Sequence, residues 1–294
     1  MRLVVTGTSG QVVRALLARA PIHTGMDVVP IGRPDLELAR IDSIGLAIAR
    51  AQPDIVVSAA AYTAVDQAED EPELARRINA EAPGELARAA RAAGVPIIHL
   101  STDYVFDGAL DRPYAEDDAT NPLGVYGRTK LEGERAVRDA NADHLILRTA
   151  WIYSRFGRNF VKTMLGLAER RDRLSVVDDQ HGNPTSAYDV ADAILQVAER
   201  WRAGPARTFG TYHMAGSGET TWCGLAREIF RASRALGGPA AEVVAIATSD
   251  YPSKARRPLN SRLDSSRFSR DFDYTAPAWQ QSVAKVVEEL VDEI

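Results

Sequence analysis

The sequence predicts an α/β protein with a Rossmann-type, doubly wound parallel sheet and a smaller C-terminal lobe. Three observations predict it. Apolar strand patterns alternate with amphipathic helical patterns through the first half of the chain, a glycine-rich turn separates the first strand from the first helix, and the alternation is lost after residue 150. With 294 residues, the chain is long enough for one large α/β domain with an added lobe.

The first strand and the first helix flank the glycine-rich turn. The apolar run 3–5 is typical of a buried parallel strand, and a helix is expected from about Gln11. Gly7 and Gly10 form the turn, while Val13 replaces the third glycine of the usual dinucleotide fingerprint. A strand, a glycine turn and a helix in this order point backbone N–H groups at a phosphate. The position after the first strand therefore indicates a dinucleotide site, although Gly-x-x-Gly alone is a weak signal.

The second strand is expected over 27–31 and ends where a Rossmann fold meets the adenosine ribose. Two charged side chains follow it. Arg33 could bind a 2′-phosphate, and Glu37 could hold ribose hydroxyls. For each of them a solvated surface charge is nearly as good an interpretation, so the choice between NAD and NADP stays open.

The other elements of the N-terminal half continue the alternation. They are a strand over 54–61 that ends in small residues, a helix over 73–93 closed by Gly94, a strand over 96–102, a helix over 126–138 and a strand over 144–148. Ligands bind at the carboxyl ends of such parallel strands. Thr102, at the end of the fourth strand, is therefore a candidate site residue.

Tyr126 and Lys130 form a Tyr-x3-Lys pair whose side chains lie one turn apart on one helix face. There an ammonium can lower the pKa of a phenol and prepare it to pass a proton. The chain has nine Tyr and only four Lys, so chance predicts roughly 0.1 such pairs. A surface helix explains the pair equally well when it is taken alone, but the glycine turn upstream favours a catalytic pair.

The sequence changes character after residue 150. Four aromatic residues cluster in a segment without a strand pattern, whereas a helix over 189–201 and a strand over 211–214 could return to the sheet. A final helix is expected from Trp279. We therefore expect an NAD(P)-binding domain over 1–150, completed by segments near 186–214, and a lobe formed mainly by 151–185 and 215–294.

Composition excludes several classes of protein. The net charge of −5, with both signs interspersed, gives no footprint for nucleic acid. No apolar run reaches membrane-spanning length and no signal peptide follows Met1, so a cytoplasmic protein is expected. The single Cys223 excludes an internal disulfide and a cysteine-based zinc site, and the five His lack metal-ligand spacing. No metal is expected.

Six blocks of sequence resemble one known family. Gly7, Gly10, Thr102 and the Tyr126–Lys130 pair are similar to the extended short-chain dehydrogenase/reductase superfamily, and within it the chain resembles the dTDP-4-dehydrorhamnose reductase family. The blocks that carry this closer resemblance are Gly10–Val12, Ala59–Asp66, Ser101–Gly108, Arg148–Trp151, Asp179–Thr185 and Ala255–Asp264. They run in order along nearly the whole chain, so the lobe is expected to bind substrate.

The resemblance implies a reaction and a set of site residues. NADPH or NADH would reduce the C4 keto group of dTDP-4-dehydro-L-rhamnose, with Tyr126 as proton donor, Lys130 on the nicotinamide ribose and Thr102 on the C4 oxygen. The implied cofactor-binding residues are Gly7, Gly10, Gln11, Val12, Arg33, Glu37, Leu38, Ala60, Ala61, Tyr62, Thr63, Tyr126 and Lys130. The implied substrate-binding residues are Thr102, Asp103, Trp151, Asn159 and Arg257, with Arg256 as a looser candidate.

Two alternatives stay open. One is another sugar-nucleotide reductase or epimerase of the same superfamily. The other is a non-catalytic homologue like the methionine adenosyltransferase regulatory subunit, which the intact Thr102, Tyr126 and Lys130 argue against. Some members of the family are metal-linked dimers that use an acidic residue in the first helix. Ala15 occupies that position here, so both a monomer and a homodimer remain compatible with the sequence.

Overall fold

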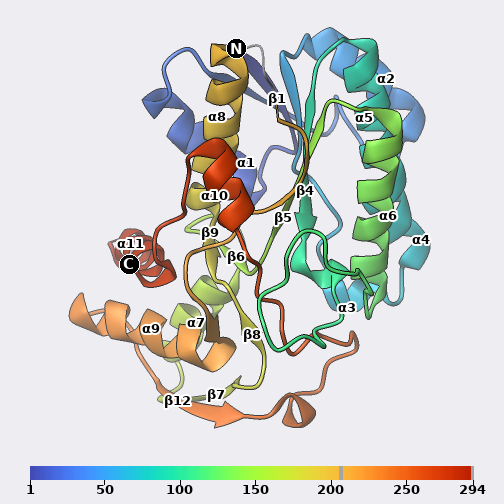
Figure 1. Cartoon of the computed structure of the whole chain (residues 1–294). Coiled ribbons are helices and arrows are strands. Elements are labelled where there is room, and N and C mark those ends of the chain that lie inside the picture. Colours follow the sequence, from blue (N-terminus) through green and yellow to red (C-terminus); the bar gives the residue numbers. More distant parts are fainter. Residues whose placement is uncertain (205–207, 293–294) are drawn as a thin grey trace.

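The computed structural model describes residues 1–204 and 208–292, and its centre is a six-stranded sheet (Figure 1). The strand order is β10-β5-β4-β3-β1-β2, and every neighbouring pair is parallel. The strands are β1 (Arg2–Thr6), β2 (Asp27–Ile31), β3 (Ile55–Ser58), β4 (Ile97–Thr102), β5 (His144–Thr149) and β10 (Gly210–His213). The order reverses between β1 and β3, which makes this the point where loops diverge and ligands bind in doubly wound sheets.

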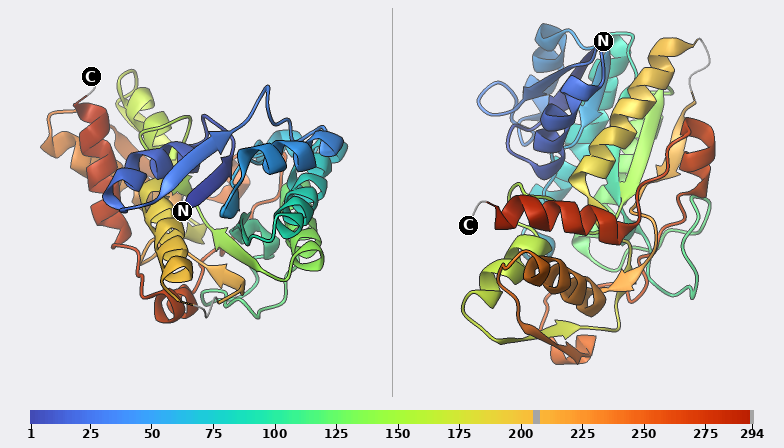
Figure 2. Two further views of the ribbon diagram at one scale, coloured as in Figure 1. Left: turned by 90° about the horizontal axis from the view of Figure 1, so that it is seen from above. Right: turned by 90° about the vertical axis from the view of Figure 1, so that its left-hand side faces the viewer.

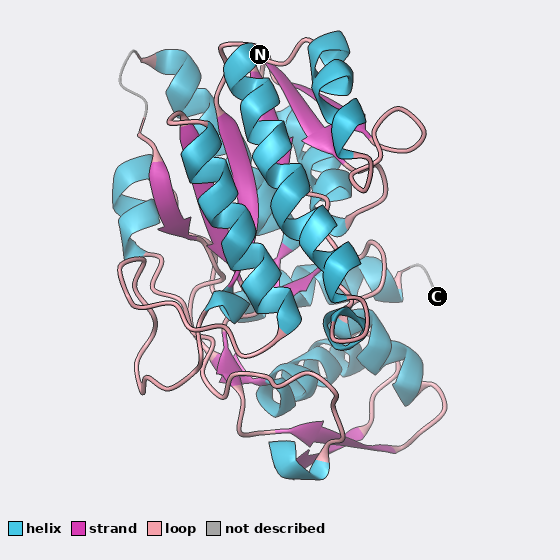
Figure 3. Cartoon of the chain, turned by 90° about the vertical axis from the view of Figure 1, so that its right-hand side faces the viewer, coloured by secondary structure: helices cyan, strands magenta, loops and turns pink. Residues whose placement is uncertain are grey.

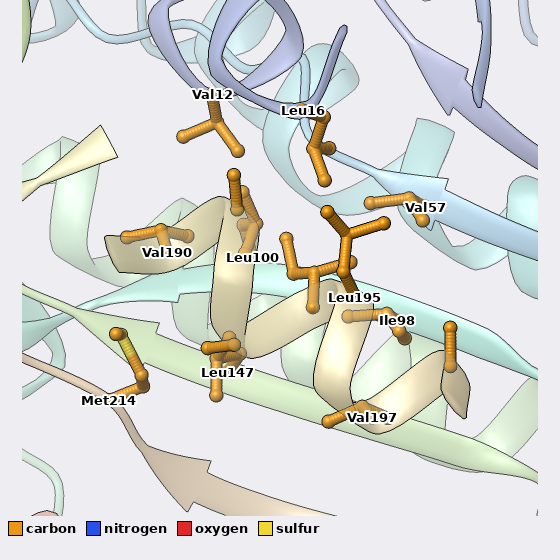
Figure 4. Close-up of a cluster of buried hydrophobic side chains, with 14 of the residues drawn as sticks. Val12, Leu16, Val57, Ile98, Leu100, Leu147, Val190, Leu195, Val197 and Met214 are labelled. Carbon is orange, nitrogen blue, oxygen red and sulfur yellow. The ribbon is translucent and has the colours of Figure 1, made fainter. Parts of the chain in front are cut away.

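Helices cover both faces of the sheet (Figure 2). One face carries α1 (Gln11–Arg19) and α8 (Ala187–Ala203), and the other carries α2 (Ile41–Ala51), α5 (Ala82–Ala92) and α6 (Val125–Ala140). Successive strand residues serve opposite layers, because strand side chains alternate in direction. Val57, Ile98, Leu100 and Leu147 meet α1 and α8 (Figure 4), whereas Val4, Val56 and Ile146 pack against α2, α5 and α6.

A second hydrophobic core builds the smaller lobe. It contains α7 (Phe160–Ala168), β7 (Arg173–Val177), α9 (Trp222–Ala235), β12 (Glu242–Ile246) and α11 (Trp279–Val291), with β7 and β12 paired in parallel. The strands of the large sheet point toward this lobe (Figure 3). The carboxyl ends of the strands therefore face the space between sheet and lobe.

Several short elements lie between these longer helices and strands. They are 3-10 turns at Ala20–Ile22, Asp103–Val105 and Thr248–Asp250, helices α3 (Val65–Ala68), α4 (Pro72–Arg76) and α10 (Ser266–Phe272), a π-helical segment at Arg77–Glu81, and strands β6 (Ile152–Tyr153), β8 (His181–Gly182), β9 (Thr185–Ser186) and β11 (Thr220–Thr221). β6 pairs with β9 and β8 with β11.

The predicted fold class is confirmed, with three differences in detail. The strand predicted over 54–61 ends at Ser58, because the amides of Ala59 and Ala60 bond to the Thr6 hydroxyl and not to a neighbouring strand. The aromatic segment after residue 150 contains a short strand, β6. Helix α10 lies in a segment predicted to be mainly lobe, yet Phe268 and Phe272 pack in the core beside α8.

The helix predicted over 73–93 is a further difference, because it is interrupted by the π-helical segment around Asn79. The Asn79 side chain accepts from the Tyr62 amide at 2.9 Å and donates to the Tyr62 carbonyl at 3.1 Å. Its own backbone carbonyl approaches Gly133 so closely that a Cβ there would lie 2.1 Å away. The bulge therefore links the loop after β3 to helix α6.

Candidate active site

The turn after β1 is shaped to approach a ligand closely. Gly7 has φ +96°, which a residue with a Cβ rarely adopts, and its amide donates to the Ile31 carbonyl at 2.6 Å. The Thr6 hydroxyl accepts from the amides of Ala59 and Ala60, each at 3.0 Å. The ends of β1, β2 and β3 are thereby bound together at the switch point.

Helix α1 begins at this turn with Gly10 as its N-cap and without a side-chain cap. Its first amides are therefore available to an anion, as a dinucleotide phosphate requires. The side-chain Oε1 of Gln11 accepts from the Ser154 hydroxyl at 2.8 Å and from Asn159 Nδ2 at 3.0 Å, which ties the turn to the lobe. Val12 is buried in the core, so its side chain supports the helix.

The loop after β2 presents an exposed guanidinium. The Arg33 side chain is 83% exposed and its Nε lies 3.5 Å from Glu37 Oε2. Glu37 is thus next to a guanidinium, while Leu38 packs in the core and leaves only its backbone for ligand contact. After β3, the small side chains of Ala60 and Ala61 are followed by Tyr62, whose hydroxyl donates to Glu71 at 2.6 Å, and by the exposed Thr63.

Thr102, Tyr126 and Lys130 come together at the carboxyl end of β4. The Thr102 hydroxyl donates to Asp103 Oδ1 at 2.8 Å and lies close to the phenol of Tyr126. Tyr104 presents its ring edge-to-face to Tyr126, with centroids 5.6 Å apart. Lys130 is buried, and its Nζ donates to the Leu100 carbonyl at 2.6 Å.

The protonation states suit proton donation by the phenol. Burial and the charge of Asp103 raise the pKa of Tyr126 above its ordinary value. The expectation that Lys130 lowers this pKa is therefore wrong for this structure, since desolvation of the phenolate dominates. Burial also lowers the pKa of Lys130 to about 8, against the opposing charge of Glu134. At neutral pH the phenol carries its proton and the amine is mostly cationic.

Asp103 and Thr149 hold buried polar atoms beside this group. Burial raises the pKa of Asp103 to about 6. Asp103 Oδ2 and Thr149 Oγ1 have no hydrogen-bond partner among the described residues. Thr149 is the register partner of Thr102 across β4 and β5. Unpaired buried polar atoms are uncommon, and at the end of two parallel strands they mark places where a ligand hydroxyl could bond.

Trp151 follows β5 in a left-handed backbone conformation, with φ +49°. Its indole stacks on Trp222 with centroids 3.6 Å apart and planes 7° apart, and its Nε1 donates to the Ser261 hydroxyl at 3.1 Å. One face of Trp151 is therefore covered by Trp222. Trp151, implied by the resemblance to bind substrate, is thus part of a two-ring stack that joins sheet and lobe.

Asn159 and Arg257 both have protein partners. Asn159 caps α7 by accepting from the Lys162 amide, and its Nδ2 donates to Gln11 and to the Ser154 carbonyl at 2.6 Å. Arg257 Nη2 donates to Asp66 Oδ2 at 2.8 Å, and the guanidinium also bonds to the Tyr104 hydroxyl. Arg257 and Tyr126 are therefore both neighbours of Tyr104, which lies between them. Arg256 is exposed.

Sequence reasoning missed several residues of this region. They are Asp66, Tyr104, Trp222, Gly182 and the buried Ser101–Glu134–Arg148 group. Some signals were present, since Ser101 and Arg148 lie in the blocks that carry the resemblance and Glu134 lies one helical turn after Lys130. Trp222 has no such marker.

No group of three or more His, Cys, Asp or Glu side chains in residues 1–204 and 208–292 is arranged to hold a metal ion. Ala15, at the position of the acidic family residue, is fully buried in the core. Within the same ranges, no helix combines the length and apolar composition needed to cross a bilayer.

The fold and this group of residues define a Rossmann-type enzyme related to the short-chain dehydrogenases/reductases. Residues 1–292 match the family described as RmlD substrate binding domain. A dTDP-4-dehydrorhamnose reductase of Sinorhizobium fredii is 47% identical over 98% of this chain and 97% of its own, and one of Burkholderia thailandensis is 42% identical over the full length of both. The chain belongs to the dTDP-4-dehydrorhamnose reductase family, which is a family of oxidoreductases.

Solved structures agree. A dTDP-4-dehydrorhamnose reductase of Clostridium acetobutylicum superposes with a TM-score of 0.90 at 36% identity over 99% of both chains. The Bacillus anthracis enzyme, solved in complex with NADP, gives a TM-score of 0.90 at 31% identity over 98% of this chain and 99% of that one. These matches confirm the family and the class of enzyme expected from the sequence.

Proposed function

We propose that this chain reduces the C4 keto group of dTDP-4-dehydro-L-rhamnose to the alcohol of dTDP-L-rhamnose, with NADPH as reductant. One observation carries the proposal. The Tyr126 phenol lies beside Thr102 at the carboxyl end of β4, and the buried Lys130 lies one helical turn away. The relatives named above bear this activity in their names.

The proposed reaction needs one proton from the protein. NADPH supplies the hydride that adds to C4, and the carbonyl oxygen then takes up a proton. Tyr126 donates it, because its raised pKa keeps the phenol protonated at neutral pH. Thr102 donates a hydrogen bond to the same oxygen as negative charge develops there. One N–H of the Lys130 ammonium donates to the Leu100 carbonyl, and the remaining N–H groups bind the nicotinamide ribose.

The residues around the first turn fit a dinucleotide. The backbone at Gly7 and the uncapped start of α1 suit the phosphates, and a Cβ at Gly7 would come within 3.3 Å of the Ala60 side chain. Exposed Arg33 can reach a 2′-phosphate, and its proximity to Glu37 makes that carboxylate a poorer acceptor for ribose hydroxyls. These features favour NADPH over NADH, in keeping with the NADP held by the Bacillus anthracis structure.

The proposed substrate contacts follow the strand ends. Asp103 Oδ2 and Thr149 Oγ1 are buried and unpaired among the described residues, and they flank Thr102. Arg257 is proposed to bind the diphosphate, because a planar guanidinium suits phosphate oxygens. Asp66 holds it in place.

The proposal is tested by following NADPH oxidation with dTDP-4-dehydrorhamnose and identifying the product by chromatography. Tyr126→Phe should fold and bind NADPH but lower kcat by about 10²–10⁴-fold. As a control, Tyr153→Phe removes the phenolic oxygen from a buried tyrosine of the lobe and should leave kcat unchanged. If Tyr126→Phe kept more than half of the turnover with chemistry rate-limiting, another group donates the proton.

Two other functions give different outcomes in this assay. Turnover of a different keto-sugar nucleotide, with none of dTDP-4-dehydrorhamnose, would favour another reductase or epimerase of the superfamily. NADPH binding without turnover of any keto sugar would favour a non-catalytic homologue. The intact Thr102, Tyr126 and Lys130 speak against the second outcome, because a binding module needs no proton donor.

A further inference from the structure

A fully buried ion pair lies behind the catalytic residues. Arg148 of β5 and Glu134 of α6 have side chains 3% and 0% exposed, and they form a two-point contact, with Nη2–Oε2 at 2.8 Å and Nε–Oε1 at 2.9 Å. Burying two charges carries a desolvation penalty, and replacing such a pair with apolar residues is often neutral or stabilising. Stability alone therefore does not explain why the pair is there.

The pair is attached to the strand that carries Thr102. The Ser101 hydroxyl donates to Glu134 Oε1 at 2.6 Å, and Ser101 directly precedes Thr102 on β4. One residue earlier, the Leu100 carbonyl accepts from Lys130 Nζ at 2.6 Å. Two consecutive residues of β4 are thus bonded to two residues of α6 that lie one turn apart. These bonds fix the strand end that bears Thr102 relative to the helix that bears Tyr126.

Arg148 is in turn held from its far side. Its Nη1 lies 3.4 Å from the Glu116 carbonyl and 3.4 Å from His213 Nε2, and the guanidinium sits 5.1 Å from the ring centre of Phe106. Burial lowers the pKa of His213 to about 3, so its neutral ring can accept from Arg148. The pair cannot shift without breaking contacts to β10 and to the loop that follows β4.

We propose that the Glu134–Arg148 pair is a positioning element of the active site. Through Ser101 it holds Thr102 of β4 in register with Tyr126 and Lys130 of α6, and its buried carboxylate lies on α6 one helical turn from the buried Lys130, where it supplies a negative charge. This inference rests on the roles proposed above for Thr102, Tyr126 and Lys130. Neither member of the pair is a catalytic residue, because both act through their neighbours.

The charge of Glu134 bears on Lys130 directly. Burial lowers the pKa of Lys130, and the Glu134 carboxylate opposes this effect. The titratable groups around Lys130 are Tyr126 and Glu134 on its own helix, His99 on β4 and, behind Glu134, Arg148 on β5. His99 is held neutral by burial. Glu134 is therefore the negative charge that favours the ammonium form.

The first test removes the hydrogen bond from Ser101 to Glu134 and keeps the Glu134–Arg148 ion pair. Ser101→Ala should lower kcat by about tenfold or more, because small displacements of reacting groups have large effects on rate. The dissociation constant for NADPH and the Tm should change little. The matched control is Ser282→Ala, which removes another buried serine that donates to a buried carboxylate, Asp189 Oδ2 at 2.7 Å, away from the catalytic residues. Its kcat should equal that of the wild type.

The second test removes the charges together. Glu134→Gln combined with Arg148→Met leaves neither member of the ion pair as a buried charge without its partner. The chain has four lysines (130, 162, 254 and 285), so the ¹³Cε resonance of Lys130 can be assigned with Lys130→Met and titrated without any substrate. The pKa of Lys130, about 8 in the wild type, should be lower in the double variant. The alkaline limb of its kcat/KM profile should move to lower pH by the same amount.

The outcomes separate this inference from the proposed function. If Tyr126→Phe retains turnover, the catalytic roles themselves are wrong. If Tyr126→Phe is inactive while Ser101→Ala keeps the wild-type kcat, the positioning role is wrong, whether or not the double variant folds. An unchanged pKa of Lys130 in a folded double variant would overturn the charge effect. A tenfold loss in Ser101→Ala with an unchanged Tm supports the proposal.

Discussion

Gly182 lies against the indole of Trp151 so closely that a Cβ at residue 182 would come within 2.4 Å of Cε2 of the ring. Trp222 covers one face of the same indole. The position and the left-handed backbone of Trp151 therefore depend on a glycine in β8 and on an aromatic residue at the start of α9. Backbone conformations of this kind persist only where the surroundings fix them.

The first prediction follows from this contact. Gly182→Ala should push Trp151 out of place and raise KM for the nucleotide sugar by about tenfold, since overpacking of a filled site typically costs about 1–3 kcal/mol. The dissociation constant for NADPH should not change. Gly166→Ala is the control, because a Cβ at that position of α7 meets no atom within 4 Å. An unaltered KM in Gly182→Ala would remove Trp151 from the substrate site.

Local patterns explain what the sequence could predict. The strands, the helices, the turn at Gly7 and the Tyr126–Lys130 spacing are all features of short segments. The structure places them close to where they were expected, apart from the early end of β3 and the π-helical segment around Asn79. The contact of Glu134 with Arg148 joins two consecutive elements, α6 and β5, whereas the stack of Trp151 on Trp222 joins segments that are distant in the chain. No periodicity marks such contacts. The direction of the shift in the Tyr126 pKa depends on burial, which a spacing pattern does not reveal.

The second prediction concerns Lys130. Lys130→Met should both weaken NADPH binding and lower kcat, because the same ammonium is proposed to bind the nicotinamide ribose and lies one helical turn from the phenol of Tyr126. In the wild type, burial lowers the pKa of Lys130 to about 8, so kcat/KM should fall as the pH rises through that value. Steady-state kinetics across pH and a fluorescence titration with NADPH measure both effects. Unchanged affinity for NADPH in the variant would contradict the ribose role.

The third prediction concerns the choice of cofactor. Arg33→Ala should lower the ratio of kcat/KM for NADPH to that for NADH by about tenfold or more, because hydrogen bonds to charged groups contribute about 1.5–3 kcal/mol. The activity with NADH should remain close to that of the wild type. Arg50→Ala, which removes an exposed arginine from the last turn of α2, is the control. A ratio that stays constant in Arg33→Ala would show that the 2′-phosphate is not recognised by this guanidinium.

The fourth prediction concerns the diphosphate. Free 4-dehydrorhamnose should be a poor substrate in kcat as well as KM, because binding energy from the remote nucleotide helps to orient the reacting carbon. Arg257→Ala should narrow the gap in kcat/KM between the nucleotide sugar and the free sugar. Asp66→Ala should narrow it less, since it leaves the guanidinium present but loosely held. Equal efficiency of the wild type with both substrates would contradict the dTDP-sugar assignment, whereas a constant gap in Arg257→Ala would contradict only the role of Arg257.

The fifth prediction links the site to stability through Asp103. Burial raises the pKa of this carboxyl from 3.8 to about 6, so its ionisation is harder in the folded than in the unfolded chain. The stabilising contribution of the neutral form is therefore complete below about pH 4 and is lost as the pH rises through about 6. At pH 8 the native protein holds a buried carboxylate whose Oδ2 has no partner among the described residues, at a cost of up to about 3 kcal/mol.

Asp103→Asn should therefore raise the Tm at pH 8 and change it little at pH 4, because the amide keeps an acceptor for the Thr102 hydroxyl without the charge. The corresponding substitution at Asp118 should change the Tm at pH 8 in the opposite direction. Its bonds to Arg112 and to the Ala115 amide lower its pKa to about 2, so Asp118→Asn should lower the Tm at pH 8. Thermal unfolding of both variants at the two pH values measures the contrast. If Asp103→Asn is more stable and has also lost affinity for the nucleotide sugar, the buried charge is kept for substrate binding at the expense of the stability of the fold. Equal Tm differences at both pH values would instead mean that Asp103 ionises in the folded protein as readily as it does in the unfolded chain.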